Sequence, residues 1–118
     1  MELSVVSHED YIAKIGDDHK FPINKFSEIA NYLIKKKIVK NFHKPYPCSE
    51  ETLKRAHSEI YIKNIINKTL DKESIKKIGF PLVDSVVKRS LVATGGTVLA
   101  SKLAIKYGLA CNTAGGSH

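Results

Sequence analysis

The fold is decided by the carboxyl-terminal stretch of residues 95–118, GGTVLASKLAIKYGLACNTAGGSH. Residues 97–107 have helical periodicity, Gly108 is a helix stop, and residues 109–113 predict a short buried strand. Gly115 and Gly116 are then expected to form a loop that presents His118. Because open α/β sheets collect ligands and catalytic groups at the carboxyl ends of their strands, this order predicts an α/β fold with His118 at that edge. From spacing alone, a mobile tail is an equal alternative.

The amino-terminal part of the chain predicts a first strand and an amphipathic helix. The strand is expected at residues 3–7, and a polar loop follows over residues 8–20. Two prolines, Pro45 and Pro47, predict an extended connection after the helix. The helix itself is indicated by apolar residues at positions i, i+3, i+4, i+7 and i+8, which are Phe26, Ile29, Ala30, Leu33 and Ile34.

Capping residues divide the middle of the chain. Ser49 is a predicted N-cap, and either one helix continues from it or Ser58 caps a second helix. Asp71 caps a further short helix that Gly79 ends, and another helical pattern begins at residue 82. In the continuous helix, one apolar face consists of Leu53, Ala56, His57, Ile60 and Tyr61. A histidine on such a face is more often a core residue than a catalytic group, so packing is the expected role of His57.

The segment Thr94-Gly95-Gly96-Thr97 has two interpretations. It follows a β-prone run and precedes a helical pattern, as a phosphate-binding turn does, but it lacks the third glycine of a dinucleotide fingerprint and the Gly-Lys-Ser/Thr of a Walker loop. The favoured interpretation is a small-residue contact between closely packed elements. The two glycines either lie within one long helix or break it into two.

Composition predicts one folded domain in a reducing setting. The chain has 118 residues, of which 42% are hydrophobic, and a net charge of +7. Only Arg55 and Arg89 are arginines, so the excess charge resembles a solvated lysine coat, and specific nucleic-acid binding is not expected. Cys48 and Cys111 suggest neither a disulfide framework nor a zinc knuckle. A cytoplasmic protein without an export signal or a membrane-spanning segment is expected.

Several segments together resemble the amino-terminal part of the histone deacetylase family, most closely its bacterial and class IV-like members. The segments are FHKPYPCSEETL (42–53), AHSEIYI (56–62), GFP (79–81), GGT (95–97) and GGSH (115–118), and DHKFPINK (18–25) is similar to the family's first loop. The resemblance covers nearly the whole chain in the family's order. Residues 1–118 are therefore expected to be a truncated amino-terminal portion of one histone deacetylase-like domain.

The resemblance implies an arginase/deacetylase fold, with three layers and a mostly parallel sheet, and hydrolysis of acetyl-lysine or related acetyl-amides at a zinc ion. His118 matches the first histidine of the family's catalytic His-His pair, at the end of a loop with Gly115 and Gly116. Lys20 matches a basic residue near an internal acetate pocket, and His57 matches a packing position. The second histidine, the zinc ligands and the oxyanion-stabilising tyrosine of the family have no counterpart here. We therefore expect no zinc binding and no deacetylase activity from this chain alone.

An incomplete domain is expected to leave strand edges and apolar helix faces without partners. A second polypeptide that supplies the rest of the sheet and the metal site is the partner this predicts, with an acetylated amine as substrate only of the completed domain. Two alternatives of other classes remain at this point. One is a non-enzymatic basic module that binds an acidic partner, and the other is a nucleotide-binding α/β domain that uses Thr94–Thr97.

Overall fold

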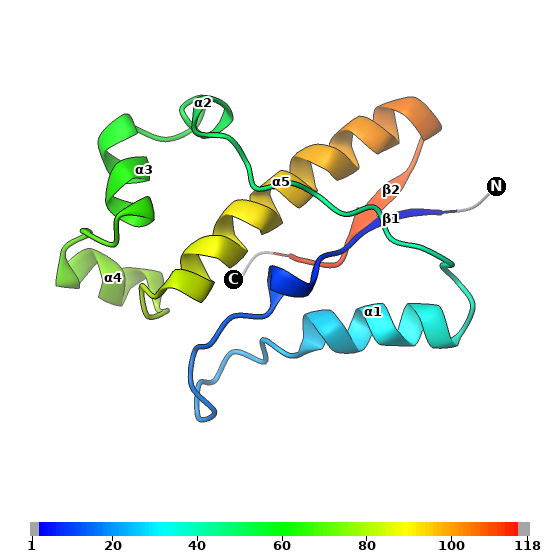
Figure 1. The fold of residues 1–118 in the computed structure, drawn as a ribbon, viewed down its shortest axis with the longest axis horizontal. Helices are drawn as coiled ribbons and strands as arrows, with labels where there is room; N and C mark the ends of the chain where they lie inside the picture. Colours follow the sequence, from blue (N-terminus) through cyan, green and yellow to red (C-terminus); the bar gives the residue numbers. More distant parts are fainter. Residues whose placement is uncertain (1–2, 116–118) are drawn as a thin grey trace.

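A computed structural model describes residues 3–115 of the chain, in which several helices are combined with a small parallel sheet (Figure 1). This arrangement confirms the mixed α/β class. The elements in chain order are β1 (Ser4–Val6), the 3-10 turn η1 (Glu9–Tyr11), α1 (Lys25–Lys35), α2 (Glu50–Leu53), α3 (Glu59–Ile66), α4 (Lys72–Ile78), α5 (Asp84–Tyr107) and β2 (Ala110–Asn112).

The sheet brings together the two strands that the sequence predicts at residues 3–7 and 109–113. β1 and β2 are parallel, with Ser4 opposite Ala110 and Val6 opposite Asn112. On its other side β1 forms a parallel bridge to His43, in the extended segment that the two prolines predicted. β1 is therefore the middle strand of this small sheet, and its Val5 and Val6 are almost fully buried.

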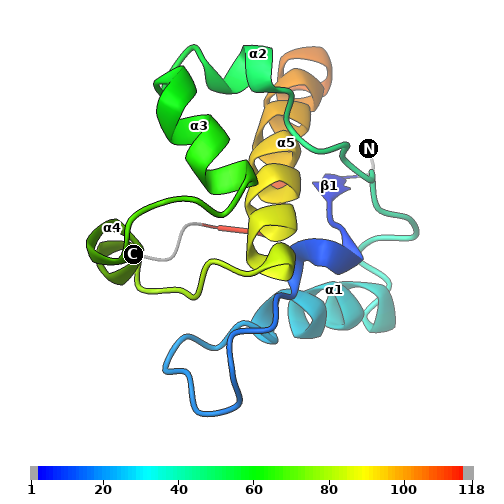
Figure 2. The same cartoon turned by 60° about the vertical axis from the view of Figure 1, so that its left-hand side comes forward.

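The long helix α5 is the central element of the fold. It packs against both strands and against η1, and Figure 2 shows it between the β1 side of the molecule and α2 and α3. Gly95 and Gly96 lie inside this one helix and are buried, which confirms the close-packing interpretation and excludes a break. A Cβ atom on Gly95 would lie 2.0 Å from the carbonyl oxygen of Tyr46. The glycines thus let other segments approach the helix axis closely.

The main core lies between α5, η1 and the beginning of α1. Its members are Tyr11, Ala13, Ile15, Ile23, Phe26, Val92 and Ala114. Residues 8–20 were expected to form a polar loop, but the structure shows that this segment contributes three of these core side chains. The expectation was wrong because apolar residues in an irregular segment have no helical or strand period that would reveal their burial.

The helix caps follow the sequence closely, with one correction. The side chains of Ser49, Ser58 and Asp71 each accept a hydrogen bond from a backbone N–H in the first turn of their helix, and Gly79 ends α4 in a left-handed conformation. Since Ser58 begins a new helix, the continuous helix through residue 61 is wrong and the alternative is confirmed. Because a new helix begins at Ser58, the residues after it no longer share a face with those before it. Ile60, which was predicted on an apolar face, is 74% exposed.

The chain exposes more surface than a monomeric protein of its mass typically does. Its accessible area is 8366 Å², whereas a monomeric protein of 13.1 kDa exposes about 6400 Å². Ile29 and Ile34, on the predicted apolar face of α1, are partly exposed, and only Phe26 of that face is fully buried. Among residues 3–115, no helix combines the length and the apolar character needed to cross a lipid bilayer.

Candidate functional site

Polar side chains gather where the two parallel strands end. Ser7 directly follows β1 and Thr113 directly follows β2, and their hydroxyl oxygens are 2.8 Å apart. The N–H of Thr113 donates to the carbonyl oxygen of Val6 at 3.0 Å, which extends the pairing of the strands by one residue. Ser7 is 7% exposed and Thr113 is half-buried, so the Ser7 hydroxyl is the more shielded of the two from water. It fixes the start of the loop that leads to Gly115.

A Tyr11–Asn112 pair, in which Tyr11 is buried and Asn112 half-buried, holds the same loop from the side of α5. The hydroxyl of Tyr11 donates to Oδ1 of Asn112 at 2.7 Å, and the N–H of Ala114 donates to the same oxygen at 3.3 Å. The Asn112 amide group donates to Thr97 Oγ1 and to the Ala93 carbonyl oxygen on α5. Asn112 therefore joins the middle of α5, η1 and the loop after β2 in one hydrogen-bond network.

Burial keeps the Tyr11 hydroxyl neutral. Desolvation raises the pKa of Tyr11 to about 12, against the opposing effects of the hydrogen bond to Asn112 and the positive charge of Arg89. The hydroxyl is consequently a hydrogen-bond donor at neutral pH and has no tendency to act as a base. Its role in this geometry is to orient Asn112.

Arg89 of α5 binds the backbone of η1 next to this network. Its Nε donates to the carbonyl oxygen of Tyr11 at 2.9 Å, and its guanidinium carbon lies 4.7 Å from the centre of the Phe26 ring. Desolvation lowers the pKa of Arg89. Within residues 3–115 its buried Nη2 atom has no hydrogen-bond partner. A planar group that stacks and donates at once fits this position better than an ammonium group.

Sequence reasoning missed Tyr11, Asn112 and Arg89 as parts of a site. Tyr11 and Asn112 are separated by 101 positions, so no local motif joins them. One signal was present: Arg89, one of only two arginines, lies close to the apolar residues Val86, Val87 and Leu91 in a helical pattern. An arginine in such a position commonly has a buried partner.

The structure does not bring the predicted site residues together. His118 and Gly116 lie outside the described residues. Gly115 is exposed, and a Cβ atom on it would meet no other atom within 4 Å. Lys20 is also exposed, on the segment between η1 and α1. In that segment His19 has the specific contacts, because its Nε2 is 3.0 Å from the Gly79 carbonyl oxygen and its ring stacks on Phe80.

The phosphate-turn interpretation of Thr94–Thr97 is wrong. These residues lie in the interior of α5, where the backbone N–H groups belong to the helix and do not point into a loop. The Thr94 hydroxyl donates to the Ser90 carbonyl oxygen of the preceding turn. The preceding β-prone run is also helical. β-Branched residues in this run gave a strand-like pattern that packing in α5 overrides.

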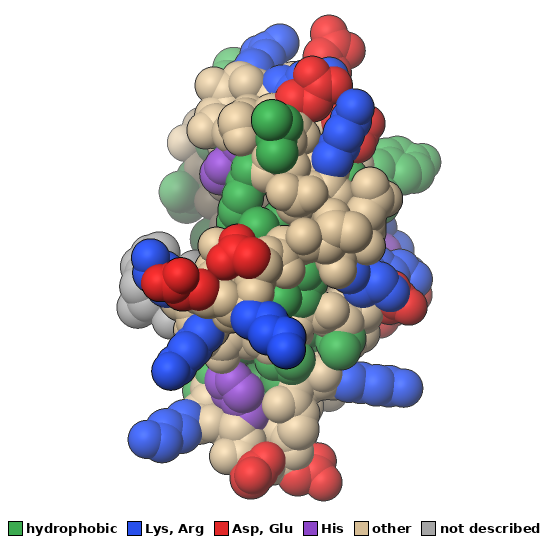
Figure 3. Space-filling model, turned by 90° about the vertical axis from the view of Figure 1, so that its left-hand side faces the viewer, with side chains coloured by type: hydrophobic (Ala, Val, Ile, Leu, Met, Phe, Trp, Pro, Cys, Tyr) green, Lys and Arg blue, Asp and Glu red, His purple; other side chains and the backbone are tan. Residues whose placement is uncertain are grey.

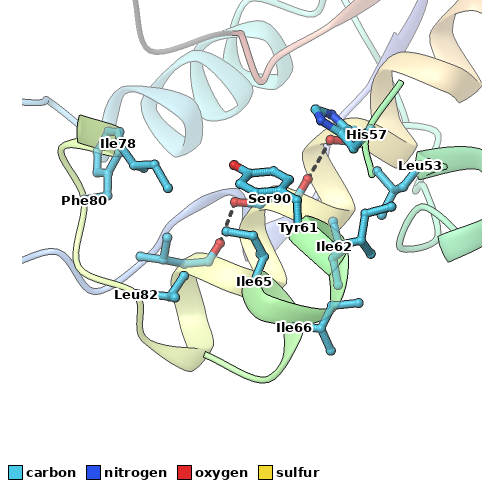
Figure 4. Close-up of a pocket in the computed structure, with 13 residues that line it drawn as sticks. Leu53, His57, Tyr61, Ile62, Ile65, Ile66, Ile78, Phe80, Leu82 and Ser90 are labelled. Atoms are coloured by element: carbon cyan, nitrogen blue, oxygen red, sulfur yellow. Dashed lines mark hydrogen bonds between the residues drawn. The ribbon is translucent and has the colours of Figure 1, made fainter. Parts of the chain in front are cut away.

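An apolar groove lies between α5 and the shorter helices α3 and α4. Its volume is about 200 Å³, and Figure 4 shows side chains from all three helices directed into it. On the face of the molecule that carries α3 and α4, apolar side chains form a band with charged groups on both sides (Figure 3). The lining residues are Leu53, His57, Tyr61, Ile62, Ile65, Ile66, Ile78, Phe80, Leu82, Val86, Ser90, Leu91 and Thr94.

His57 borders this groove and is not buried in the core. Its ring is exposed and lies 5.6 Å from the ring of Tyr61, which is 38% exposed. The predicted core position of His57 is therefore wrong, although the contact with Tyr61 is a packing contact. Because His57 is the only ionisable group besides Tyr61 among the lining residues, the groove is suited to apolar contact more than to acid–base chemistry.

No metal site is formed by the described part of the chain. Within residues 3–115, no three side chains of His, Cys, Asp or Glu are close enough together to hold a metal ion. These residues therefore do not fit the zinc ion that the resemblance implies, and zinc chemistry is not assigned to them.

Comparison with known proteins identifies a relative of uncharacterized function. No family model matches the chain. The chain is 36% identical over 120 residues to an uncharacterized protein of the cyanobacterium Picosynechococcus sp.. The match covers all of this chain and 40% of that protein. The chain thus spans about two fifths of the length of this relative.

Proposed function

We propose that this chain forms the amino-terminal part of a zinc-dependent deacetylase domain of the arginase/deacetylase fold, which hydrolyses acetyl-lysine or related acetyl-amides when the rest of the domain is present. The observation that carries the proposal is the convergence of Ser7, Asn112 and Thr113 at the carboxyl ends of two parallel strands. This edge is where α/β domains place reacting groups. The loop held there leads toward the glycine and histidine positions that resemble the deacetylase family.

The residues of this chain have a positioning role in the proposal. Asn112 accepts from the N–H of Ala114 while Tyr11 donates to it, so the backbone that precedes Gly115 is fixed relative to α5. The Ser7–Thr113 hydroxyl pair fixes the same loop relative to β1. Two anchors on a short loop reduce its freedom, which is what the display of a catalytic group requires. When bound, zinc would polarise the amide carbonyl and activate water.

The uncovered area agrees with a domain that has further parts. The accessible surface exceeds the expectation for a monomer of this mass by roughly 2000 Å². An area of this size on one chain exceeds the roughly 800 Å² that each partner buries in a standard protein–protein interface. The relative from Picosynechococcus is longer than the matched region, and the proposal assigns the cover of this surface to residues outside the match.

A chimera tests the proposed function. In it, this chain replaces the matched 120 residues of the Picosynechococcus protein, so that one polypeptide contains both parts. We expect the chimera to hydrolyse an acetyl-lysine peptide with zinc, and the chain alone to give no hydrolysis above background under the same conditions. Removal of zinc with a chelator should abolish the activity, and re-addition should restore it.

Two variants of the chimera test whether His118 takes part in the hydrolysis. His118→Ala should reduce kcat by at least about 100-fold at unchanged zinc content, because proton transfer by a positioned histidine typically contributes that much. Ser101→Ala, at an exposed position on α5, is the matched control and should retain activity. A folded, zinc-loaded chimera without amide hydrolysis would refute the proposed function.

A further inference from the structure

We propose that the carboxyl end of α1 and the extended segment after it form a docking surface for a lipid bilayer rich in anionic phospholipid. This inference goes beyond the proposed function, because the surface lies away from the candidate site. Its evidence is a concentration of lysines and exposed apolar side chains in one stretch of the chain. We call it the α1-end surface, and its members are Tyr32, Ile34, Lys35, Lys36, Lys37, Ile38, Lys40 and Lys44.

The positive charge of the chain is not spread evenly over its surface. Residues 29–49 contain five lysines and no acidic residue, so this stretch carries five of the seven excess positive charges. All five lysines are exposed. Lys44 pairs with Glu9, whereas Lys63 on α3 pairs with an acidic neighbour of its own helix. Within residues 3–115, no ion pair involves the other four lysines of the stretch, which are Lys35, Lys36, Lys37 and Lys40.

Large apolar side chains are exposed between these lysines. Ile34 and Ile38, on either side of the lysine triplet, are 42% and 49% exposed, and Tyr32 is 56% exposed. The Lys36 ammonium group lies 5.8 Å from the centre of the Tyr32 ring, so charged and apolar groups are in direct contact. A surface that combines lysines with aliphatic and aromatic side chains is typical of proteins that lie on a membrane interface.

Lys37 has a backbone conformation that normally favours glycine. Its φ is +58°, which a residue with a Cβ atom adopts only at a cost in free energy. Lys68, after α3, has the same φ, but its side chain pairs with Asp84. Lys37 has no such ion pair within residues 3–115. The strained position therefore supports a role for the Lys37 charge outside the fold.

The backbone that carries the lysines is held in place. Val39 is almost fully buried between them. The N–H of His43 donates to the carbonyl oxygen of Val5 at 2.9 Å, and the carbonyl oxygen of His43 accepts from the N–H of Ser7 at 3.1 Å. Lys40 and Lys44 are therefore presented on an ordered segment, which reduces the entropy lost on docking.

The α1-end surface and the candidate site lie at opposite ends of β1. Lys40 lines a hollow with Leu3 and Ser4, at the amino end of this strand. Figure 1 shows the end of α1 and the amino end of β1 on the same side of the molecule. The candidate site is at the carboxyl ends of the strands, beside Ser7 and Thr113. A bilayer bound at the α1-end surface therefore leaves that site uncovered.

An anionic bilayer fits this surface better than an acidic protein or a nucleic acid. The basic groups are all lysines, which are point charges on flexible stems, whereas carboxylates or phosphates in a fixed geometry favour the arginine fork. Lipid phosphates form an array without such a geometry and attract clusters of lysines. Single-stranded nucleic acids stack their bases on aromatic rings, but two of the three exposed apolar side chains here, Ile34 and Ile38, are aliphatic.

Binding to vesicles tests this proposal. The full chain is mixed with vesicles of phosphatidylcholine, with or without phosphatidylserine, and the bound fraction is measured by sedimentation. We expect binding only to the vesicles that contain phosphatidylserine, and weaker binding as the salt concentration rises. One lysine near such a surface contributes about fivefold in affinity. The triple variant Lys35→Gln, Lys36→Gln, Lys37→Gln should therefore bind at least about tenfold more weakly.

A second triple variant is the matched control for net charge. Lys72→Gln, Lys76→Gln, Lys77→Gln removes the same number of charges from α4, where Asp71 and Glu73 are close in sequence. Its binding should change much less. Equal losses in the two triple variants would show that net charge alone drives binding, and would overturn the proposed surface.

Two serine variants test the apolar contribution. Ile38→Ser should weaken vesicle binding by about fivefold, because half of this side chain is available for burial in the interface. Ile105→Ser is the control, since Ile105 is 88% exposed on α5 and lies outside the surface. Equal effects of the two substitutions would indicate general adhesion of apolar side chains and would contradict the proposal.

Lys37→Gly keeps the test independent of folding failure. Glycine suits a positive φ, so this variant should raise the midpoint of urea unfolding while it weakens vesicle binding. Unchanged vesicle binding in this variant and in the α1 triple variant overturns the proposal, as does the absence of binding to vesicles that contain phosphatidylserine. Tighter binding to a single-stranded RNA oligonucleotide, insensitive to Ile38→Ser, also overturns it and identifies a nucleic acid as the partner. None of these measurements depends on amide hydrolysis, so their failure is distinct from failure of the proposed function.

Discussion

Replacement of Gly95 by alanine is expected to destabilise the protein, although alanine favours helices. The added Cβ would lie 2.0 Å from the carbonyl oxygen of Tyr46 and 3.1 Å from the backbone nitrogen of Cys48. Both are main-chain atoms, so no side-chain rotation relieves the clash. The segment must move away from α5, which strains or breaks the 2.8 Å hydrogen bond from the Cys48 N–H to the Leu91 carbonyl oxygen.

The expected magnitude follows from three terms. Forcing a methyl group into a packed contact costs about 1–3 kcal/mol. Loss of one backbone hydrogen bond costs about 1 kcal/mol more. Replacing glycine by alanine in a helix contributes about 1 kcal/mol in the opposite direction. We therefore expect Gly95→Ala to lower the free energy of unfolding by about 2 kcal/mol, which corresponds to a decrease in Tm of roughly 8 °C in a domain of this size.

Urea unfolding followed by far-UV circular dichroism measures this change. The midpoint should fall while the m-value stays the same. The matched control is Ser101→Ala, which lies on the same helix at an exposed position and should be neutral or slightly stabilising. If Gly95→Ala were as stable as the unmodified chain or more stable, helix propensity would dominate at this position and the close approach of residues 46–48 to α5 would be refuted.

Three further expectations concern the buried network. Gly96→Ala should cost about 2 kcal/mol in urea unfolding, because its Cβ would lie 2.1 Å from the Tyr11 hydroxyl and 2.9 Å from the Asn112 amide; an unchanged midpoint would contradict this contact. Tyr11→Phe should cost about 1 kcal/mol at pH 7, with Tyr46→Phe neutral as the control. The fold favours the neutral form of Tyr11, because its pKa is raised from 10.0 to about 12. The stabilisation that this side chain provides is therefore complete below pH 10 and is lost between pH 10 and about 12. In Tyr11→Phe, the free energy of unfolding should not show this loss as the pH rises. Arg89→Lys should cost about 1–2 kcal/mol, because an ammonium group cannot both stack and donate as the guanidinium does; equal stability would refute that role.

Local signals in the sequence predicted most of the helix ends. Ser58 and Asp71 begin helices because their side-chain oxygens bond to free N–H groups of the first turn, and that interaction needs only neighbouring residues. Gly79 ends a helix for an equally local reason, its tolerance of a positive φ. Such features depend on a few adjacent positions and are visible without a structure.

Side-chain burial was less predictable from the same signals. His57 has the spacing of a core residue only if one helix continues through it, and the cap at Ser58 interrupts that helix. Apolar spacing on α1 correctly predicted a helix, but Ile29 and Ile34 remain partly exposed. Periodicity reveals which residues share a face and does not reveal whether another element covers that face.

The sequence by itself determined the helix caps at Ser49 and Asp71, the helix stops at Gly79 and Gly108, and the positions of the two strands, because each depends on signals between neighbours along the chain. Only the tertiary structure decided that Gly95 and Gly96 lie within one helix, since the Tyr46 carbonyl oxygen and the Tyr11 hydroxyl reach them from distant segments. The same holds for the Tyr11–Asn112 bond and for the parallel pairing of β1 and β2, which join residues more than 100 positions apart. Interactions across such separations form only when the chain is folded, and no local pattern encodes them.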